Sequence, residues 1–177
     1  MIKRIVNTFN SARLDYMFTG ALAASYYGTP RTTMDVDVVV EVTKRNCLTR
    51  LVSALEMVGL KADRRKIDSA LRSNFRIVTF RDGKTPFTVD IILSRTKLMK
   101  KTGSILGLPT YYETPEGLIL AKLRMIKATI PRERALKDED DIKAILKFSK
   151  IHMNVLKRRA RKDNTLPILK MVTAGKF

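Results

Sequence analysis

Hydrophobic and polar positions follow two different periods along the chain, and each period predicts a different kind of element. Apolar residues spaced three or four positions apart predict helices over residues 2–12, 21–27 and 44–58. Short apolar runs bounded by turn residues predict strands over residues 16–19, 35–42, 75–80 and 87–93, with a last short strand at 111–112. The segment 35–42 is the clearest strand, because valine occupies five of its eight positions.

The pattern becomes wholly helical after residue 113. Thr114-Pro115-Glu116 is typical of a helix start, since proline is favoured at the first helical position. Helices are then predicted over residues 116–127 and 138–148 and in a basic stretch beyond Lys150. The sequence therefore predicts an α+β fold, in which a mixed β-sheet flanked by helices (residues 1–113) is followed by a basic α-helical region (residues 114–177).

The net positive charge of the chain indicates which kind of partner it can attract. It carries 35 Lys and Arg against 17 Asp and Glu, a net charge of +18. Residues 147–177 contain nine Lys or Arg residues and one acid, Asp163. Such a field attracts polyanions, of which nucleic acid is the usual one. The alternative is general surface charge, as in a heat-adapted protein, and charge alone leaves both interpretations open.

Several classes of protein are excluded by what the sequence lacks. The longest apolar runs, such as residues 36–42, are far too short to span a bilayer, and the N-terminus shows no secretory signal. The single cysteine, Cys47, excludes an internal disulfide framework and a cysteine-based zinc site. We therefore expect a cytoplasmic protein without a membrane partner.

Two acids at the start of the valine-rich strand are candidate metal ligands. Residues two apart in a strand point to the same face, so Asp35 and Asp37 project together with Cα atoms roughly 6–7 Å apart. Adjacent carboxylates repel each other unless a cation lies between them, and hard oxygen ligands suit Mg²⁺ or Mn²⁺. The alternative is that one Asp ends the strand and the other faces water.

A third acid, Asp90, lies within the apolar strand at residues 88–92. If that strand pairs beside the first, three carboxylates converge on one or two divalent ions, which is the arrangement that two-metal phosphoryl transfer requires. The alternative is that a neighbouring Lys or Arg neutralises Asp90, since a buried unpaired acid is costly.

Residues 16–23 and 28–38 together carry a glycine followed by a small residue, a helix, and an Asp-x-Asp flanked by hydrophobic residues. This arrangement resembles the opening motif of the DNA polymerase β-like nucleotidyltransferase superfamily. The Gly-x-Pro-Arg-x-Thr-x-Asp-x-Asp spacing from Gly28 to Asp37 is most similar to the minimal prokaryotic branch that includes the AbiEii-type toxins of type IV toxin–antitoxin systems.

The resemblance continues downstream and covers about residues 15–148 in the family's order. Asp90 matches the family's third metal-binding acid. Residues 114–123 resemble its lysine-bearing helix, with Lys122 at the lysine. The segment from Arg134 to Ile142 resembles its Arg-x-x-Lys-Asp-x-x-Asp-hydrophobic motif.

The resemblance implies the nucleotidyltransferase fold and a metal site in which Asp35, Asp37 and Asp90 hold Mg²⁺ or Mn²⁺. Backbone amides near Gly20, at a helix N-terminus, would bind the nucleotide phosphates. The family usually has Gly or Ser after this glycine, where the chain has Ala21, so a phosphate-binding hydroxyl would have to come from Thr19. The expected nucleotide-binding residues are Thr19, Gly20, Ala21, Arg31 and Thr33.

The same resemblance assigns a role to Lys122, which would reach the triphosphate or fix the carboxylates; the alternative is an ordinary helix lysine paired with an acid. Arg31 would clamp a phosphate or pair with Asp35. Asp138 and Asp141 would position Lys122 or the substrate, or would only be acids favoured by a helix N-terminus.

The implied function is metal-dependent transfer of a nucleoside monophosphate from an NTP to a hydroxyl acceptor. The basic C-terminal helices favour RNA, such as tRNA, as the acceptor. The resemblance to the branch that includes the AbiEii-type toxins implies a toxin with an antitoxin partner. The alternative is a catalytically weak nucleic-acid-binding protein that retains the fold, which Ala21 and the +18 charge support.

Overall fold

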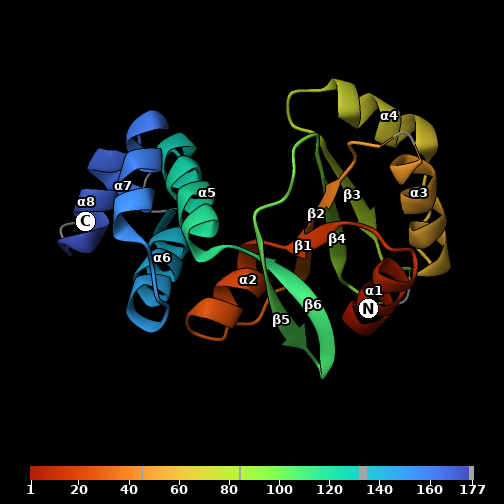
Figure 1. The fold of residues 1–177 in the computed structure, drawn as a ribbon, viewed down its shortest axis with the longest axis horizontal. Helices are drawn as coiled ribbons and strands as arrows, with labels where there is room; N and C mark the ends of the chain where they lie inside the picture. The colour runs from red at the N-terminus through yellow and green to blue at the C-terminus, as the bar shows by residue number, and fades with distance from the viewer. Residues whose placement is uncertain (45, 84, 132–134, 176–177) are drawn as a thin grey trace. The chain divides into compact units, whose positions relative to one another are not determined.

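The structure is a computed structural model that describes residues 1–44, 46–83, 85–131 and 135–175. The chain forms two compact units (Figure 1). Unit 1 comprises Met1–Leu22 and Thr32–Glu113, and unit 2 comprises Ala23–Arg31 and Thr114–Phe177. No helix in the described ranges is long and apolar enough to cross a membrane.

Unit 1 is built on a six-stranded mixed sheet in the order β3-β4-β2-β1-β6-β5. Its strands are β1 (Tyr16–Phe18), β2 (Asp35–Glu41), β3 (Ile77–Arg81), β4 (Thr88–Ser94), β5 (Lys100–Ile105) and β6 (Leu108–Glu113). The pairs β2–β4 and β1–β6 are parallel, whereas β1–β2, β3–β4 and β5–β6 are antiparallel. The mixed sheet that the sequence predicts is confirmed.

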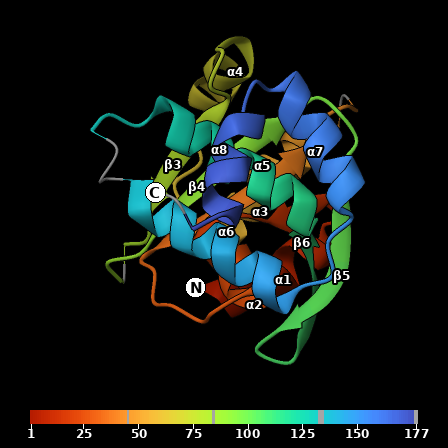
Figure 2. The ribbon, with the colours of Figure 1, turned by 90° about the vertical axis from the view of Figure 1, so that its left-hand side faces the viewer.

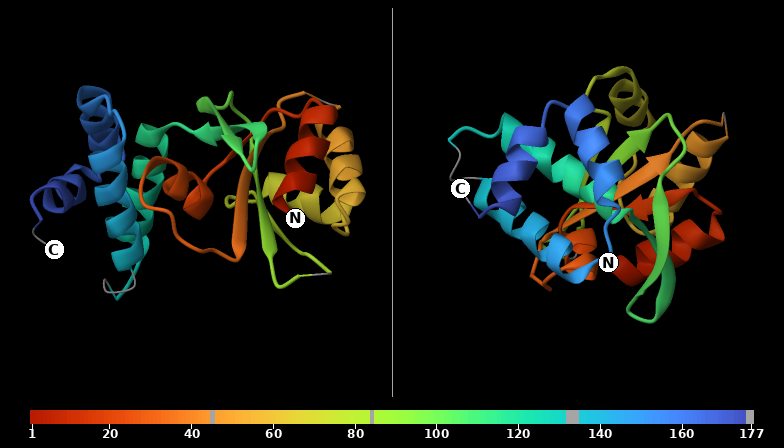
Figure 3. Two further views of the ribbon diagram at one scale, coloured as in Figure 1. Left: turned by 90° about the horizontal axis from the view of Figure 1, so that it is seen from below. Right: turned by 60° about the vertical axis from the view of Figure 1, so that its left-hand side comes forward.

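Three helices lie wholly within unit 1: α1 (Ile2–Ser11), α3 (Cys47–Met57) and α4 (Arg64–Arg72). Helices α1 and α3 lie side by side (Figures 1 and 3). Their apolar faces are buried with alternate residues of β2, among them Val36, Val38 and Val40. Because the strand period is two, the other residues of β2 face the opposite side of the sheet.

Unit 2 is helical and contains α5 (Pro115–Ala128), α6 (Leu136–Phe148), α7 (Met153–Lys162) and α8 (Leu166–Thr173) (Figure 2). The predicted start of α5 is confirmed, because Thr114 Oγ1 accepts from Gly117 N at 3.3 Å and proline follows the cap. Helix α2 (Gly20–Tyr27) begins in unit 1 and continues into unit 2. There the segment 23–31 contacts α6 closely, since a Cβ on Gly28 would lie 2.9 Å from Ala144 Cβ.

The structure also contains elements that the sequence pattern does not predict. Helix α4 buries only Ile67, because its apolar residues, Ile67, Ala70 and Leu71, are few beside its charged ones. Strand β5 is an edge strand with no buried residue, so it lacks the alternation by which a strand is recognised. The basic stretch beyond Lys150 forms two helices, because the chain turns at Asn164, whose φ is +53°.

Candidate active site

Asp35, Asp37 and Asp90, named here the carboxylate cluster, lie on one face of the sheet in unit 1. Strands β2 and β4 pair in parallel with Asp37 directly opposite Asp90. The intervening Val36 and Val89 are buried opposite each other, so the three acids point to the other, more open face. Neighbouring strands are about 4.8 Å apart. The strand of Asp90 thus lies beside that of Asp35 and Asp37, which is the condition under which the three carboxylates can converge.

Threonine hydroxyls orient two of these carboxylates. Asp35 Oδ1 accepts a hydrogen bond from the hydroxyl of Thr88, and Asp90 Oδ1 accepts from Thr79 Oγ1 at 2.5 Å. With the side chains in these positions, the residues that the structure describes include no group of three His, Cys, Asp or Glu arranged to hold a metal ion. The three acids share a face, but one oxygen each of Asp35 and Asp90 is directed to a hydroxyl donor.

The residues of the carboxylate cluster nevertheless fit a divalent cation by placement and chemistry. Like charges directly opposite each other on neighbouring strands, such as Asp37 and Asp90, destabilise a sheet unless a cation separates them. Carboxylate oxygens are the donors that Mg²⁺ and Mn²⁺ prefer. Strand pairing fixes the backbone at Asp35 and Asp90. For these two carboxylates to bind a cation, only their side-chain rotamers need to change.

The backbone at Gly20 brings the N-terminus of α2 against Asp37. Gly20 has a φ of +58°, and a Cβ added there would overlap Asp37 Oδ2 and lie 2.7 Å from its Cγ. Thr19 N donates to Asp37 O at 3.0 Å, which fixes the approach. The first amides of a helix have no partner within the helix and attract anions. The candidate phosphate-binding turn and the candidate metal ligand Asp37 are thus adjacent within unit 1.

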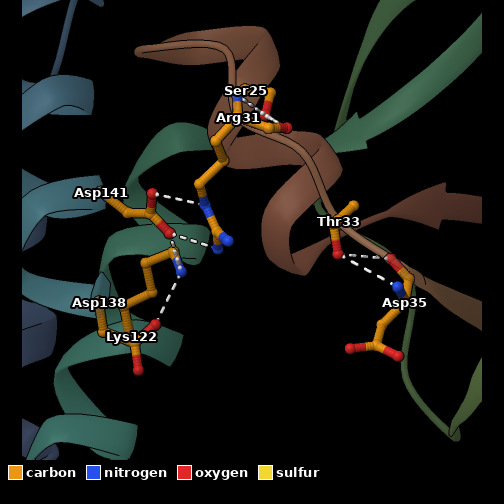
Figure 4. Close-up of polar contacts among 7 residues, drawn as sticks. All are labelled: Ser25, Arg31, Thr33, Asp35, Lys122, Asp138 and Asp141. Atoms are coloured by element: carbon orange, nitrogen blue, oxygen red, sulfur yellow. Dashed lines mark hydrogen bonds and ion pairs between the residues drawn. The ribbon is translucent and has the colours of Figure 1, made fainter. Parts of the chain in front are cut away.

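The side chains beside Gly20 offer fewer hydrogen-bond donors to an anion than the backbone amides of this turn do. Thr19 is 7% exposed, and its Oγ1 donates to Glu113 Oε2 at 2.5 Å. Ala21 has no hydroxyl. Thr33 Oγ1 accepts from Asp35 N at 3.1 Å and contacts Asp35 O at 3.2 Å, so its hydroxyl shapes the start of β2 (Figure 4).

A second group of charged residues, named here the Lys122 cluster, lies in unit 2 and comprises Arg31, Lys122, Asp138 and Asp141 (Figure 4). Lys122 of α5 is 5% exposed, and its Nζ lies 2.8 Å from Asp138 Oδ1 and 2.7 Å from Asp141 Oδ2. Arg31 holds Asp141 with both sides of its guanidinium, Nε–Oδ1 at 3.1 Å and Nη2–Oδ2 at 3.0 Å. Two cations and two carboxylates therefore balance each other.

These contacts bear on the alternatives that the sequence leaves open. The ion-pair partner of Arg31 is Asp141, and the backbone of Arg31 is held by Ser25, whose Oγ accepts from its amide at 3.2 Å. Asp138 and Asp141 both contact Lys122, which fits a positioning role. A contact of Lys122 with nucleotide stays a prediction. Arg134, from the same motif, lies outside the described residues, as do Lys176 and Phe177.

The predictions from the sequence do not include three residues that lie near the carboxylate cluster: Thr79, Thr88 and Glu113. Thr88 precedes Asp90 by two positions, so the strand period places it on the same face and would have identified it. Thr79 reaches the site through the antiparallel pairing of β3 with β4, which the turn dipeptide Asp82-Gly83 indicates, and Glu113 through the pairing of β6 with β1, which no local pattern indicates.

Replacement of Gly20 tests the approach of α2 to Asp37. We expect Gly20→Ala to displace the Asp37 carboxylate and to lower nucleotide binding at least tenfold, measured by calorimetry with an NTP and Mg²⁺. Its backbone strain should also lower the free energy of unfolding by roughly 1–2 kcal/mol.

Gly107→Ala is the matched control for this substitution. Gly107 also has a positive φ, +80°, but a Cβ there meets nothing within 4 Å. It should therefore lose similar stability and keep full nucleotide affinity. Equal loss of affinity in both variants would contradict a specific role for the Gly20–Asp37 contact.

Solved structures with the same fold are known. ANT(2'')-Ia in complex with adenylyl-2''-tobramycin is similar over 92% of this chain and 96% of its own, with a TM-score of 0.64 and 14% identity. The solution structure of the same antibiotic-resistance factor gives a TM-score of 0.62 at 14% identity, covering 92% of this chain and 90% of that one.

A nucleotidyltransferase-like antigenic protein from Paracoccidioides brasiliensis is similar over 92% of this chain and 88% of its own, with a TM-score of 0.55 and 16% identity. Neither a protein-family model nor a curated protein matches the sequence. The structural likeness shows that the chain has the nucleotidyltransferase fold, as the motifs implied.

Proposed function

We propose that this chain, which has the nucleotidyltransferase fold, transfers a nucleoside monophosphate from an NTP to a hydroxyl acceptor and releases pyrophosphate. The observation that carries the proposal is the pairing of Asp37 with Asp90, on the same face as Asp35 and against the glycine that begins α2. A purely structural sheet has no need of three acids at one place on one face, since acids are poor strand residues.

In this proposal the carboxylate cluster holds one or two divalent ions. When bound, such ions neutralise phosphate charge and make the attacking hydroxyl more acidic. The first amides of α2 bind phosphate oxygens, and Gly20 leaves room for them beside Asp37. Thr79 and Thr88 hold the side chains of Asp90 and Asp35 on the open face of the sheet. Thr33 positions Asp35 through its backbone.

The Lys122 cluster has a positioning role in this proposal. Lys122 and Arg31 share Asp141, so the cluster ties the segment 23–31 to α5 and α6 within unit 2. That segment continues α2, whose first turn carries the proposed phosphate-binding amides. We further propose that Lys122 or Arg31 contacts the triphosphate, because both are cations held in fixed orientation by carboxylates.

Transfer of label from each of the four α-³²P NTPs to total tRNA tests the function. We expect one NTP to label the RNA in the presence of Mg²⁺ or Mn²⁺ and no label in EDTA. Labelling that is equal with and without a divalent ion would contradict the metal site. Labelling of no acceptor, with RNA, protein and aminoglycosides each tried, would contradict the transferase proposal.

RNA is the acceptor that we favour, because α7 presents cations to solvent. Its exposed basic residues are Lys157, Arg158, Arg161 and Lys162. Only Leu156 and Ala160 of this helix are buried, so the basic residues cover most of its free surface. A phosphate-tracking surface of this kind binds RNA through its backbone, with little dependence on sequence.

Salt dependence measures this contribution. Replacing the four exposed cations of α7 by Gln should reduce the slope of log K against log salt concentration for a tRNA ligand by about 3. The matched control replaces the four exposed cations of α4, Arg64, Arg65, Lys66 and Arg72, by Gln, and should leave the slope nearly unchanged. A reduced slope in the α4 variant, with an unchanged slope in the α7 variant, would indicate that RNA binds at α4 and would contradict the role of α7.

RNA binding without transfer is the second candidate function. The observation that favours it is the turn at Gly20, where Thr19 donates its hydroxyl to Glu113 and Ala21 has none to offer. Binding of tRNA with a steep salt slope, no label transfer and no dependence on Mg²⁺ would support this function over the first.

A role as the toxin of a toxin–antitoxin pair is the last part of the proposal. Its support is the spacing from Gly28 to Asp37, which resembles that of AbiEii-type toxins. Expression should then slow bacterial growth, and Asp35→Ala should remove the effect. Equal inhibition by both forms would contradict toxicity through transfer, and growth without inhibition by either would contradict a toxin role.

A further inference from the structure

A cavity of about 710 Å³ lies in unit 1, away from the carboxylate cluster. It is lined by the end of α1, the start of α3, the end of β2 and the β5–β6 hairpin. Glu41, the last residue of β2, contributes to its wall, whereas Asp35 is the first residue of that strand. Residues 35 and 41 are six strand steps apart, about 20 Å. We name it the distal cavity.

Cations predominate among the charged residues that line the distal cavity. They are Arg13, Lys44, Arg50 and Lys100, and the acids are Asp15 and Glu41. Lys100 forms an ion pair with Asp15. Glu41 accepts hydrogen bonds from Thr43 Oγ1 at 2.8 Å and from Leu98 N at 3.3 Å. Arg13, Lys44 and Arg50 form no ion pair with any residue that the structure describes, so the cavity wall carries excess positive charge.

Arg50 is held in place within this wall. Its Nη1 lies 3.4 Å from Ala12 O and 3.3 Å from Arg13 O, at the C-terminal end of α1, and its Nη2 lies 3.5 Å from Cys47 Sγ. Its Nε is buried and has no hydrogen-bond partner among the described residues. The guanidinium of Arg50 is therefore held in one orientation, and its hydrogen-bonding capacity is not fully used. Binding of a ligand beside it would cost little side-chain entropy.

Neutral residues form the rest of the wall, some of them polar, such as Thr110, and others apolar, such as Leu14 and Pro109. Thr110 is buried, and its Oγ1 lies 3.0 Å from the hydroxyl of Tyr16, which donates to Asn10 Oδ1 at 3.0 Å. Burial raises the pKa of Tyr16, against the effect of the Thr110 hydrogen bond, so its hydroxyl stays neutral. Cys47, the first residue of the 11-residue helix α3, also lines the cavity, so the positive end of the helix dipole adds to the charge.

We propose that the distal cavity binds a small phosphorylated ligand, of nucleotide size or less. Its volume lies within the range of small-molecule sites, roughly 300–1,000 Å³. Three cations that form no ion pair with a described residue suit an anion that carries two or more charges. The proposal does not depend on the transfer activity, because no residue of the carboxylate cluster lines the cavity.

Amide chemical shifts of the full-length, ¹⁵N-labelled protein locate such a ligand directly. Pyrophosphate and ADP are titrated separately in EDTA, so that metal-dependent nucleotide binding at the carboxylate cluster does not contribute. We expect saturable shifts at Leu14, Gly103 and Tyr111, which line the cavity, and none at Gly20 or Asp90. Tighter binding of ADP would identify a nucleotide, and equal binding would identify the phosphates alone as the recognised group.

Charge reversal of two exposed cavity residues provides the variant. Arg13→Glu/Lys44→Glu should weaken binding at least tenfold, and both side chains are exposed, so the fold should tolerate the change. Lys3→Glu/Lys97→Glu makes the same charge change on exposed residues of unit 1 outside the cavity, and should alter binding less than twofold. Equal weakening in both variants, shifts confined to other residues, or displacement of pyrophosphate by an RNA oligonucleotide that binds the same residues more tightly would each overturn the proposal.

Discussion

The Asp37→Asn variant is expected to lose nucleotidyl transfer by more than about a hundredfold, because even partners outside the first shell of a metal site contribute 10–100-fold. The substitution keeps the shape of the side chain and removes only its charge. Asp37 is the acid that lies opposite Asp90 and against Gly20, so in the proposed function it serves both the metal site and the phosphate-binding turn. The rate of label transfer from the preferred NTP measures the loss.

Two further measurements separate a lost metal site from a damaged fold. Mg²⁺ with nucleotide should raise the melting temperature of the native protein and not that of Asp37→Asn, since a ligand stabilises only the state that binds it. Asp68→Asn makes the same chemical change on α4, where Arg64, at 3.9 Å, is the one ion-pair partner of Asp68 among the described residues, and should keep full activity. Transfer by Asp37→Asn at the native rate would refute the proposed metal site.

Lys122→Met is expected to lower the free energy of unfolding by about 3 kcal/mol, because removing one partner of a buried ion pair leaves an uncompensated charge. Lys122 is 5% exposed and contacts both Asp138 and Asp141. Methionine fills much of the same volume, so the loss reports charge rather than packing. Denaturant unfolding monitored by circular dichroism measures it.

Lys127→Met is the control on the same helix. Lys127 is exposed, and within the part of the chain that the structure describes its Nζ hydrogen-bonds only to Asp163 O, at 3.5 Å, so its replacement should change stability by less than about 0.5 kcal/mol. Adding Asp138→Asn to Lys122→Met should recover part of the stability, since Asp138 then lacks the cation that it pairs with, whereas Asp141 keeps Arg31. If Lys122→Met destabilises no more than Lys127→Met, the Lys122 cluster does not hold unit 2 together.

The placement of the carboxylate cluster follows from the sequence, but its side-chain orientation does not. An acid within an apolar strand is unusual enough to identify Asp35, Asp37 and Asp90 as candidates, and the strand period fixes the face that they share. The hydroxyl that each carboxylate contacts depends on strand register. Thr79 meets Asp90 only because β3 pairs antiparallel with β4 at that position.

The Lys122 cluster can likewise be predicted from the sequence only in part. The motif at residues 134–142 places Asp138 and Asp141 on one face of a helix, and this much is set by helical spacing. Arg31 and Asp141 are 110 positions apart, and no periodicity relates them. Their ion pair depends on how the segment 23–31 packs within unit 2, which is a property of tertiary structure.

The chain passes between its two units three times, between residues 22 and 23, 31 and 32, and 113 and 114. A fragment that ends at residue 113 would therefore keep residues 23–31 but lose the α6 surface on which Gly28 packs and the carboxylate that holds Arg31. Recombination at that boundary would separate residues 23–31, which include most of α2, from the helix on which they pack. We therefore expect that a single crossover cannot exchange the helical part alone.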